Sequence, residues 1–306
     1  MNGRSATLIA LPLALIAAGA TAQTAAERLD LPAPDAREGQ MVEVNGAEIF
    51  VSESGEGDVL MLLHGYPLSG ALFERMRDTL DDSYRVVTID HRGYGMSTTP
   101  EPVTDVATYA EDALAVMSEL GIESAAIGGM SMGGPITMEM YRQNPDAFDA
   151  MILIDTNHEP AGAIEAGIWA GARTSLEDTG EVSSIVPFLM PNMLTGETRM
   201  VSEPAAADYL TAAMEMASLD GAIGGANVLE NRPDSTQTLT DAGEAGLPVL
   251  VLVGREDTVY PVAISQAMAD ATGGEIAIIE GASHAAVFER PKESAAAIAS
   301  FLGGIE

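Results

Sequence analysis

Gly-Met-Ser-Met-Gly at residues 129–133 is a G-x-S-x-G pentapeptide, set between a run of small and apolar residues at 124–128 and a helix-forming segment at 135–142. A serine in a sharp turn from a strand to a helix needs this context, because flanking glycines leave room for a strained backbone. Pro135 fits the first turn of the following helix. The stretch predicts that Ser131 ends a buried parallel strand and presents its hydroxyl as a nucleophile.

Two further polar residues follow apolar runs later in the chain. The run Pro-Val-Leu-Val-Leu-Val at 248–253 leads to Asp257, and the run Ile-Ala-Ile-Ile at 276–279 leads to His284. A serine hydroxyl needs a base within reach and a third group that orients that base. We therefore predict a catalytic triad of Ser131, His284 and Asp257, in which His284 takes the serine proton.

Several motifs, in the right order, resemble those of the α/β-hydrolase superfamily between about residues 41 and 305. They are His64-Gly65-Tyr66-Pro67, the turn Asp90-His91-Arg92-Gly93-Tyr94-Gly95-Met96-Ser97, the G-x-S-x-G turn, the G-x-x-D pattern ending at Asp257, and His284 ahead of Glu289-Arg290-Pro291. The sequence is most similar to small serine esterases, enol-lactonases and cofactor-free haloperoxidase-like enzymes. This resemblance implies a serine hydrolase without a cofactor. Because some relatives carry the acid after an earlier strand, Asp155 stays an alternative to Asp257.

Backbone donors are expected around the reacting carbonyl group. The N–H of Met132 directly follows the nucleophile, and the N–H of Tyr66 lies in the His-Gly-Tyr-Pro turn, so both are candidates for an oxyanion hole. The remaining histidines, His64, His91 and His158, lack a partner motif. We expect His64 to serve as a structural hydrogen-bonding residue beside the oxyanion turn.

The apolar pattern predicts the architecture. A hairpin is expected around Asn45-Gly46, followed by strands at 59–63 and 85–89 that alternate with helices near 71–80 and 105–120. Such alternation is typical of an α/β fold with a mainly parallel, doubly wound sheet covered by helices on both faces. Residues 41–156 and 248–306 are the expected core.

The stretch 157–247 lacks strand-like runs and contains a helical segment at 205–217. An insertion of this size predicts a helical cap over the carboxyl edge of the sheet, where open α/β folds bind ligands. It contains Met190, Met193, Met200, Met214 and Met216. Met190 and Met193 are candidates for an apolar substrate pocket, with packing inside the cap as the alternative.

The first residues resemble a targeting sequence. Residues 1–22 combine one positive charge, a short apolar segment and Ala20-Thr21-Ala22, which predicts a signal peptide cleaved after Ala22 and export to the periplasm or the medium. An uncleaved anchor is the alternative, but the apolar part is short and contains Pro12. Residues 23–40, with Pro32 and Pro34, are expected to be a linker.

Charge narrows the class of partner. The chain has 46 acidic and 14 basic residues, a net charge of −32, and no cysteine. Such a charge opposes binding to nucleic acid or to anionic membranes. The expected partner, a small-molecule ester, is instead what the triad motifs and the resemblance imply. The absence of cysteine excludes thiol nucleophiles and cysteine-ligated metals.

These features predict hydrolysis of a carboxylic ester, either a small or medium acyl ester or a lactone, through an acyl-enzyme on Ser131. Perhydrolysis and C–C bond hydrolysis use the same triad and remain alternatives. A non-catalytic binding module is a third possibility, although binding alone would not need the triad.

Overall fold

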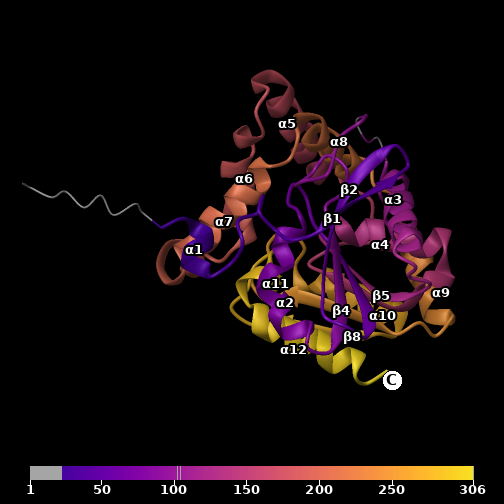
Figure 1. Ribbon diagram of the computed structural model, residues 1–306. Helices are drawn as coiled ribbons and strands as arrows, with labels where there is room; N and C mark the ends of the chain where they lie inside the picture. Colours follow the sequence, from indigo (N-terminus) through magenta and orange to yellow (C-terminus); the bar gives the residue numbers. More distant parts are fainter. Residues whose placement is uncertain (1–22, 102, 104, 306) are drawn as a thin grey trace, which may run out of the picture.

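A sheet of eight strands runs through the computed structural model, which describes residues 23–101, 103 and 105–305 (Figure 1). The order across the sheet is β1-β2-β4-β3-β5-β6-β7-β8. The hairpin β1 (Gln40–Val44) and β2 (Ala47–Ser54) joins antiparallel to β4 (Tyr84–Ile89). The other neighbours pair in parallel: β3 (Asp58–Leu63), β5 (Ala125–Met130), β6 (Phe148–Ile154), β7 (Val249–Gly254) and β8 (Glu275–Ile279). The expected α/β class and mainly parallel sheet are confirmed.

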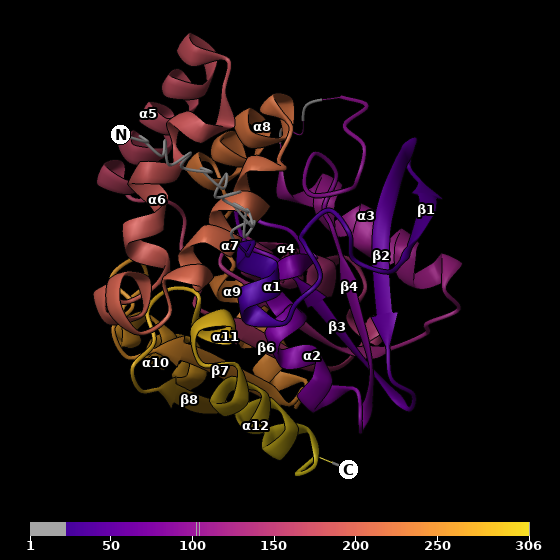
Figure 2. The ribbon, with the colours of Figure 1, turned by 60° about the vertical axis from the view of Figure 1, so that its left-hand side comes forward.

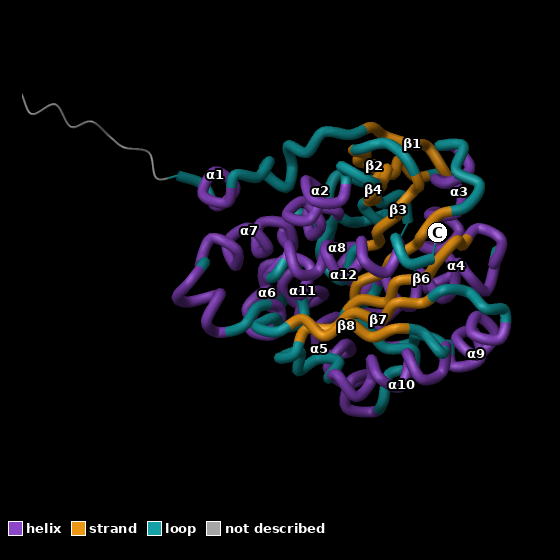
Figure 3. The backbone as a smooth tube through the Cα atoms, turned by 90° about the horizontal axis from the view of Figure 1, so that it is seen from below, coloured by secondary structure: helices purple, strands orange, loops and turns teal. Residues whose placement is uncertain are grey.

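Helices cover both faces of this sheet, which is why β5 and β7 are buried at every position. Figure 3 shows the two layers on either side of the strands. One layer contains α2 (Glu74–Leu80), α11 (Ala286–Glu289) and α12 (Pro291–Leu302). The other contains α3 (Val106–Glu119), α4 (Gly133–Gln143), α9 (Thr236–Glu244) and α10 (Val262–Thr272).

The cap lies beyond the carboxyl ends of the strands, above the sheet in Figure 1. It is built from α5 (Ala163–Thr179), α6 (Val186–Met193), α7 (Pro204–Glu215) and α8 (Leu219–Glu230), with α5 packed against α8. All of residues 157–247 are described, and they contain no strand. However, α9 packs against α4 and α10 in the core layer, so the cap ends before this helix rather than at residue 247.

The segment expected to be a linker, residues 23–40, is instead packed against both parts of the molecule. Its helix α1 (Ala25–Leu29) lies against α7 of the cap (Figure 2). The Tyr209 hydroxyl of α7 donates to the carbonyl oxygen of Pro32 at 3.1 Å. Arg37 forms a buried ion pair with Asp90 of the core at 2.6 Å. Local composition could not reveal these contacts, because their partners lie far away in the sequence.

The predicted signal peptide, residues 1–22, lies outside the described residues. Over the part of the chain that the structure describes, no helix has the length and apolar character needed to cross a membrane.

Candidate active site

Ser131 occupies a strained turn at the junction of β5 and α4. Its φ is +52°, a left-handed conformation that is rare outside glycine, and its side chain reaches the cavity described below. The flanking glycines are needed because the turn is crowded. A Cβ on Gly129 would lie 2.1 Å from the Gly133 carbonyl oxygen, and one on Gly133 would lie 2.3 Å from that of Leu63. The G-x-S-x-G pattern therefore follows from contacts between backbone segments.

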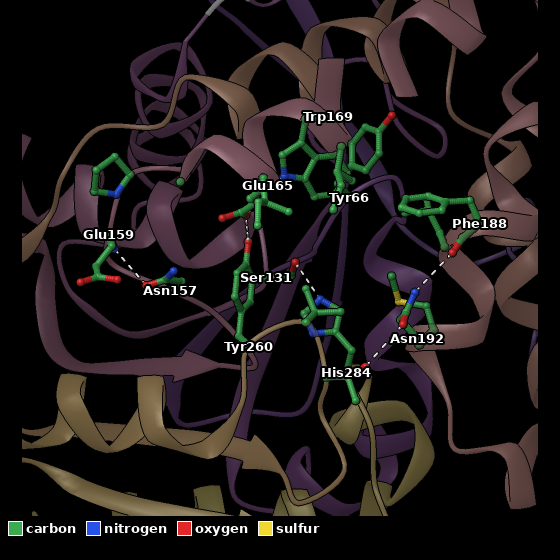
Figure 4. Close-up of a pocket in the computed structure, with 18 of the residues that line it drawn as sticks. Tyr66, Ser131, Asn157, Glu159, Glu165, Trp169, Phe188, Asn192, Tyr260 and His284 are labelled. Atoms are coloured by element: carbon green, nitrogen blue, oxygen red, sulfur yellow. Dashed lines mark hydrogen bonds between the residues drawn. The ribbon is translucent and has the colours of Figure 1, made fainter. Parts of the chain in front are cut away.

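The three residues predicted as a triad come together at the carboxyl edge of the sheet. His284 Nε2 lies 3.0 Å from Ser131 Oγ (Figure 4). On the other side of the ring, His284 Nδ1 lies 2.9 Å from Asp257 Oδ2. The second carboxylate oxygen of Asp257 accepts the backbone N–H groups of Val259 at 2.7 Å and Tyr260 at 3.1 Å. These bonds fix the carboxylate so that Oδ2 faces the imidazole. The arrangement can move a proton from the hydroxyl to the imidazole.

Asp155, the alternative acid, is engaged elsewhere. Its side chain is fully buried, and its oxygens accept the N–H groups of Gly254 at 2.8 Å and Ala286 at 3.1 Å. Burial and the neighbouring charge of Asp257 raise the pKa of Asp155 well above its ordinary value, although the two backbone bonds oppose this shift. Asp155 thus connects the last residue of β7 with the first residue of α11. Asp257 is the carboxylate that contacts His284.

The turn expected to supply an oxyanion donor lies against Ser131. A Cβ on Gly65 would lie 2.9 Å from Ser131 Cβ, so only glycine allows this approach. His64 holds the turn, because its Nδ1–H donates to the Gly65 carbonyl at 2.9 Å while its Nε2 accepts the N–H of His91 at 2.9 Å. Burial lowers the pKa of His64 to about 3, which keeps the ring neutral. The structural role expected for His64 agrees with these contacts.

The two proposed donors, the N–H groups of Tyr66 and Met132, make no hydrogen bond to any described protein acceptor. Tyr66 is fixed from the cap side, since its hydroxyl donates to the Ala222 carbonyl of α8 at 2.9 Å. Both N–H groups thus come from backbone close to Ser131, one in the turn beside it and one in the next residue. Such a pair can stabilise a developing negative charge.

A cavity of about 870 Å³ separates the cap from the sheet edge and reaches Ser131 and His284. Its apolar walls come from α5 and α6 of the cap: Ile164, Ile168, Trp169, Phe188, Leu189 and Met193. Of the two predicted methionines, only Met193 lines the cavity, together with Leu189 one helical turn before it. Met190 is buried in the cap but is not on the cavity wall. The α6 residues on that wall, Phe188, Leu189, Asn192 and Met193, form one side of the helix, and position 190 lies beside that side rather than at its centre.

One cavity-lining network was not apparent from the sequence. The Tyr260 hydroxyl donates to Glu165 Oε1 at 2.8 Å, and Arg232 binds both oxygens of Glu165 at 2.5 and 2.7 Å. Burial alone would raise the pKa of Glu165, but its hydrogen bonds, first with Arg232 and then with Tyr260 and Trp169, hold the pKa below its ordinary value. The Tyr260 ring also meets the His284 ring edge-on at 5.6 Å. The network therefore joins the cap to the loop that carries Asp257.

Comparison with known proteins agrees with this geometry. A family model described as alpha/beta hydrolase fold matches residues 58–291. The chain is 27% identical over 260 residues to AB hydrolase superfamily protein YisY of Bacillus subtilis, covering 83% of this chain and 94% of that protein. It is 26% identical over 254 residues to a putative non-heme chloroperoxidase of Synechocystis, covering 78% and 88%. A thermophilic esterase from Thermogutta terrifontis superposes with a TM-score of 0.80 at 26% identity, covering 87% and 97%. The resemblance expected from the motifs is confirmed.

Proposed function

Because the chain belongs to the α/β-hydrolase fold family, we propose that it hydrolyses carboxylic esters through a catalytic triad of Ser131, His284 and Asp257. One observation carries the proposal: an unbroken series of hydrogen bonds joins Ser131 Oγ, His284 and Asp257 and opens onto the cavity. An ester of small or medium acyl length, or a lactone, could enter this cavity, since its volume lies in the range of small-molecule sites, roughly 300–1,000 Å³.

The first half of the proposed reaction forms an acyl-enzyme. His284 Nε2 accepts the proton of Ser131 as the Oγ attacks the ester carbonyl carbon. The carbonyl oxygen becomes an oxyanion and accepts the N–H groups of Tyr66 and Met132, each worth about 10²–10³ in rate. Asp257 stabilises the imidazolium and keeps its tautomer. His284 then gives the proton to the departing alcohol oxygen as the C–O bond breaks.

The second half repeats the same steps with water. His284 takes a proton from the attacking water, the oxyanion forms again at the same donors, and Ser131 Oγ leaves with the proton returned by His284. The products are a carboxylic acid, an alcohol and the free enzyme. No cofactor takes part in either half.

Perhydrolysis is the second candidate, favoured by 28% identity over 246 residues to the bifunctional esterase/perhydrolase DCH of Acinetobacter calcoaceticus. Hydrogen peroxide would replace water as the nucleophile on the acyl-enzyme and give a peroxy acid. Formation of peroxy acid from acetate and peroxide, abolished in Ser131→Ala, would support this activity beside ester hydrolysis.

The direct test is a panel of 4-nitrophenyl esters graded from acetate to decanoate, assayed with the wild type and Ser131→Ala. We expect turnover that the variant lacks, and intact-mass detection of an acyl adduct on Ser131 after rapid quenching. A fluorophosphonate probe should label the wild type and leave Ser131→Ala unlabelled. Equal ester turnover by the two proteins would refute the nucleophile.

We also propose that the protein is exported, on the basis of the pattern in residues 1–22. Expression of the full chain followed by N-terminal sequencing of the exported product tests this. We expect the mature chain to begin at Gln23, and retention of the full-length chain in the cytoplasm would contradict the proposal.

A further inference from the structure

The cavity is lined by carboxylates and by no lysine or arginine from the described residues. Apart from His284 and two tyrosines, Tyr66 and Tyr260, the ionisable lining residues are Glu159 and Glu165. Arg232 lies close by, but its side chain is only 1% exposed and both of its terminal nitrogens bind Glu165. A ligand in the cavity therefore meets carboxylates and no free cation.

The remaining wall is apolar or neutral. Trp169, Leu189 and Met193 lie inside, and its neutral polar members include Asn157, Asn192 and Thr258. The apolar part continues outward. Ile164 and Phe188 also line the cavity, yet they are 85% and 50% exposed, so they belong to its mouth. An apolar chain attached to the reacting carbonyl could thus stay in contact with apolar side chains from Ser131 to the outer surface.

We propose that this cavity accepts esters whose chain is uncharged and apolar, and rejects esters that carry a carboxylate there. The inference rests on the proposed ester hydrolysis. A substrate carboxylate would lose water in the cavity without gaining an arginine or lysine partner, and burial of an unpaired charge is strongly unfavourable. Glu159 would add like-charge repulsion, whereas the charge of Glu165 is offset by its ion pair with Arg232.

Substitution of Glu159 is the more direct test of this repulsion. Its side chain is exposed and makes no hydrogen bond to another described residue, while its backbone accepts from Arg232 and donates to Asn157. Replacement by glutamine removes the charge and keeps the backbone contacts. Glu177 is an exposed residue of α5 outside the cavity lining, so Glu177→Gln removes the same charge from the same cap as a matched control.

The test uses three 4-nitrophenyl esters of one chain length: the octanoate, the monosuberate with a terminal carboxylate, and the 8-(trimethylammonio)octanoate. Rates in Ser131→Ala are subtracted as background. We expect kcat/KM for the monosuberate to fall at least about tenfold below that of the octanoate, mostly through KM, because repulsion of this kind opposes binding. The cationic ester should fall less than the anionic one.

Assays at two salt concentrations distinguish repulsion inside the cavity from repulsion by the overall net charge of −32. Assays at 0.05 and 0.5 M NaCl differ in Debye length, roughly 14 and 4 Å, so distant charges are screened at the higher salt. We expect most of the monosuberate penalty to survive. Glu159→Gln should raise the ratio of monosuberate to octanoate turnover severalfold, whereas Glu177→Gln should leave it unchanged.

Equal kcat/KM for octanoate and monosuberate would overturn the inference and leave ester hydrolysis intact. Equal shifts in Glu159→Gln and Glu177→Gln, or loss of the penalty at 0.5 M NaCl, would also overturn it, because the discrimination would then come from the overall charge. Absence of turnover for all three esters above the Ser131→Ala background would instead refute the proposed function.

Discussion

The carboxyl edge of the sheet and the cap face each other across one cavity, but they are constructed differently. At the edge, backbone groups fix the polar side chains: two N–H groups hold Asp257, and the Gly65 carbonyl and the His91 N–H hold His64. In the cap, the wall is mainly apolar, and Ile164 and Phe188 remain exposed at its mouth. The contrast suggests that the edge determines the reaction and the cap selects the substrate, so substitutions in each should have separable effects.

The largest difference should appear between substitutions of the predicted triad and substitutions in the cap. We expect Ser131→Ala and His284→Ala each to lower kcat for the octanoate ester about 10⁵- to 10⁶-fold, since triad members act as a unit. Phe188→Ala should change it by less than about tenfold. Steady-state kinetics with thermal melting of each variant checks this, and a Phe188→Ala loss as large as that of Ser131→Ala would erase the contrast.

The two buried carboxylates provide the next test. Asp257→Asn should lower kcat about 10⁴-fold at nearly unchanged stability, because the imidazole loses its orienting partner. Asp155→Asn leaves one backbone N–H without an acceptor, which should cost about 1–3 kcal/mol of stability, with a smaller effect on kcat per folded molecule. Kinetics and urea unfolding of both variants distinguish the roles. The reverse pattern would assign the acid to Asp155.

Histidines on the two sides should respond differently to pH. Burial lowers the pKa of His64 to about 3, so below pH 6.5 the unfolded chain binds a proton that the folded chain refuses, and stability falls as pH falls. From pH 7 to 5 this amounts to about 2 kcal/mol, or roughly 30-fold in the folding equilibrium. Burial also lowers the pKa of His158, a buried residue beside the cap.

Urea unfolding at pH 7 and pH 5 measures this effect in the wild type, His64→Gln and His158→Gln. We expect His64→Gln to remove more of the pH dependence than His158→Gln. Identical pH dependence in the wild type and His64→Gln would show that His64 is not held neutral by burial.

The smallest effect should separate two methionines of α6. Met193→Ala should change the ratio of octanoate to acetate turnover by up to about tenfold, because its side chain lines the cavity. Met190→Ala should leave the ratio unchanged and lower stability by about 2–5 kcal/mol, as loss of a buried side chain does. Chain-length profiles and melting temperatures of both variants test this. Parallel changes in the two would mean that both residues only pack the cap.

The sequence predicted the sheet edge better than the cap, for a physical reason. Ser131 sits in a turn whose backbone contacts require glycine at 129 and 133, so a short motif reports its geometry. Asp155 and Asp257 both follow buried strands. Only their contacts in the folded structure show that Asp155 binds backbone N–H groups and that Asp257 contacts His284. In the cap, a methionine can line a pocket or pack in the core. The sequence therefore could not predict that Met193 lines the cavity and Met190 does not.

Long-range polar contacts were also beyond local patterns. Glu165 and Arg232 are 67 residues apart, and neither belongs to a recognisable motif. Tyr260 lies three residues after Asp257, yet its contact with His284 depends on how the loop after β7 folds. The lining of the cavity therefore depends on residues that only the tertiary structure brings together.

The packed segment at residues 23–40 has a consequence for protein engineering. In the chain the cap is an insertion between β6 and β7, which invites its exchange between hydrolases as a removable module. In the folded protein, however, α1 packs against α7, and the Tyr209 hydroxyl of α7 donates to the Pro32 carbonyl. Arg37 of the same segment forms a buried ion pair with Asp90 of the core. A grafted cap would expose the surface of α1 or meet it with the wrong side chains. The unit that can be transplanted is the cap together with residues 23–40.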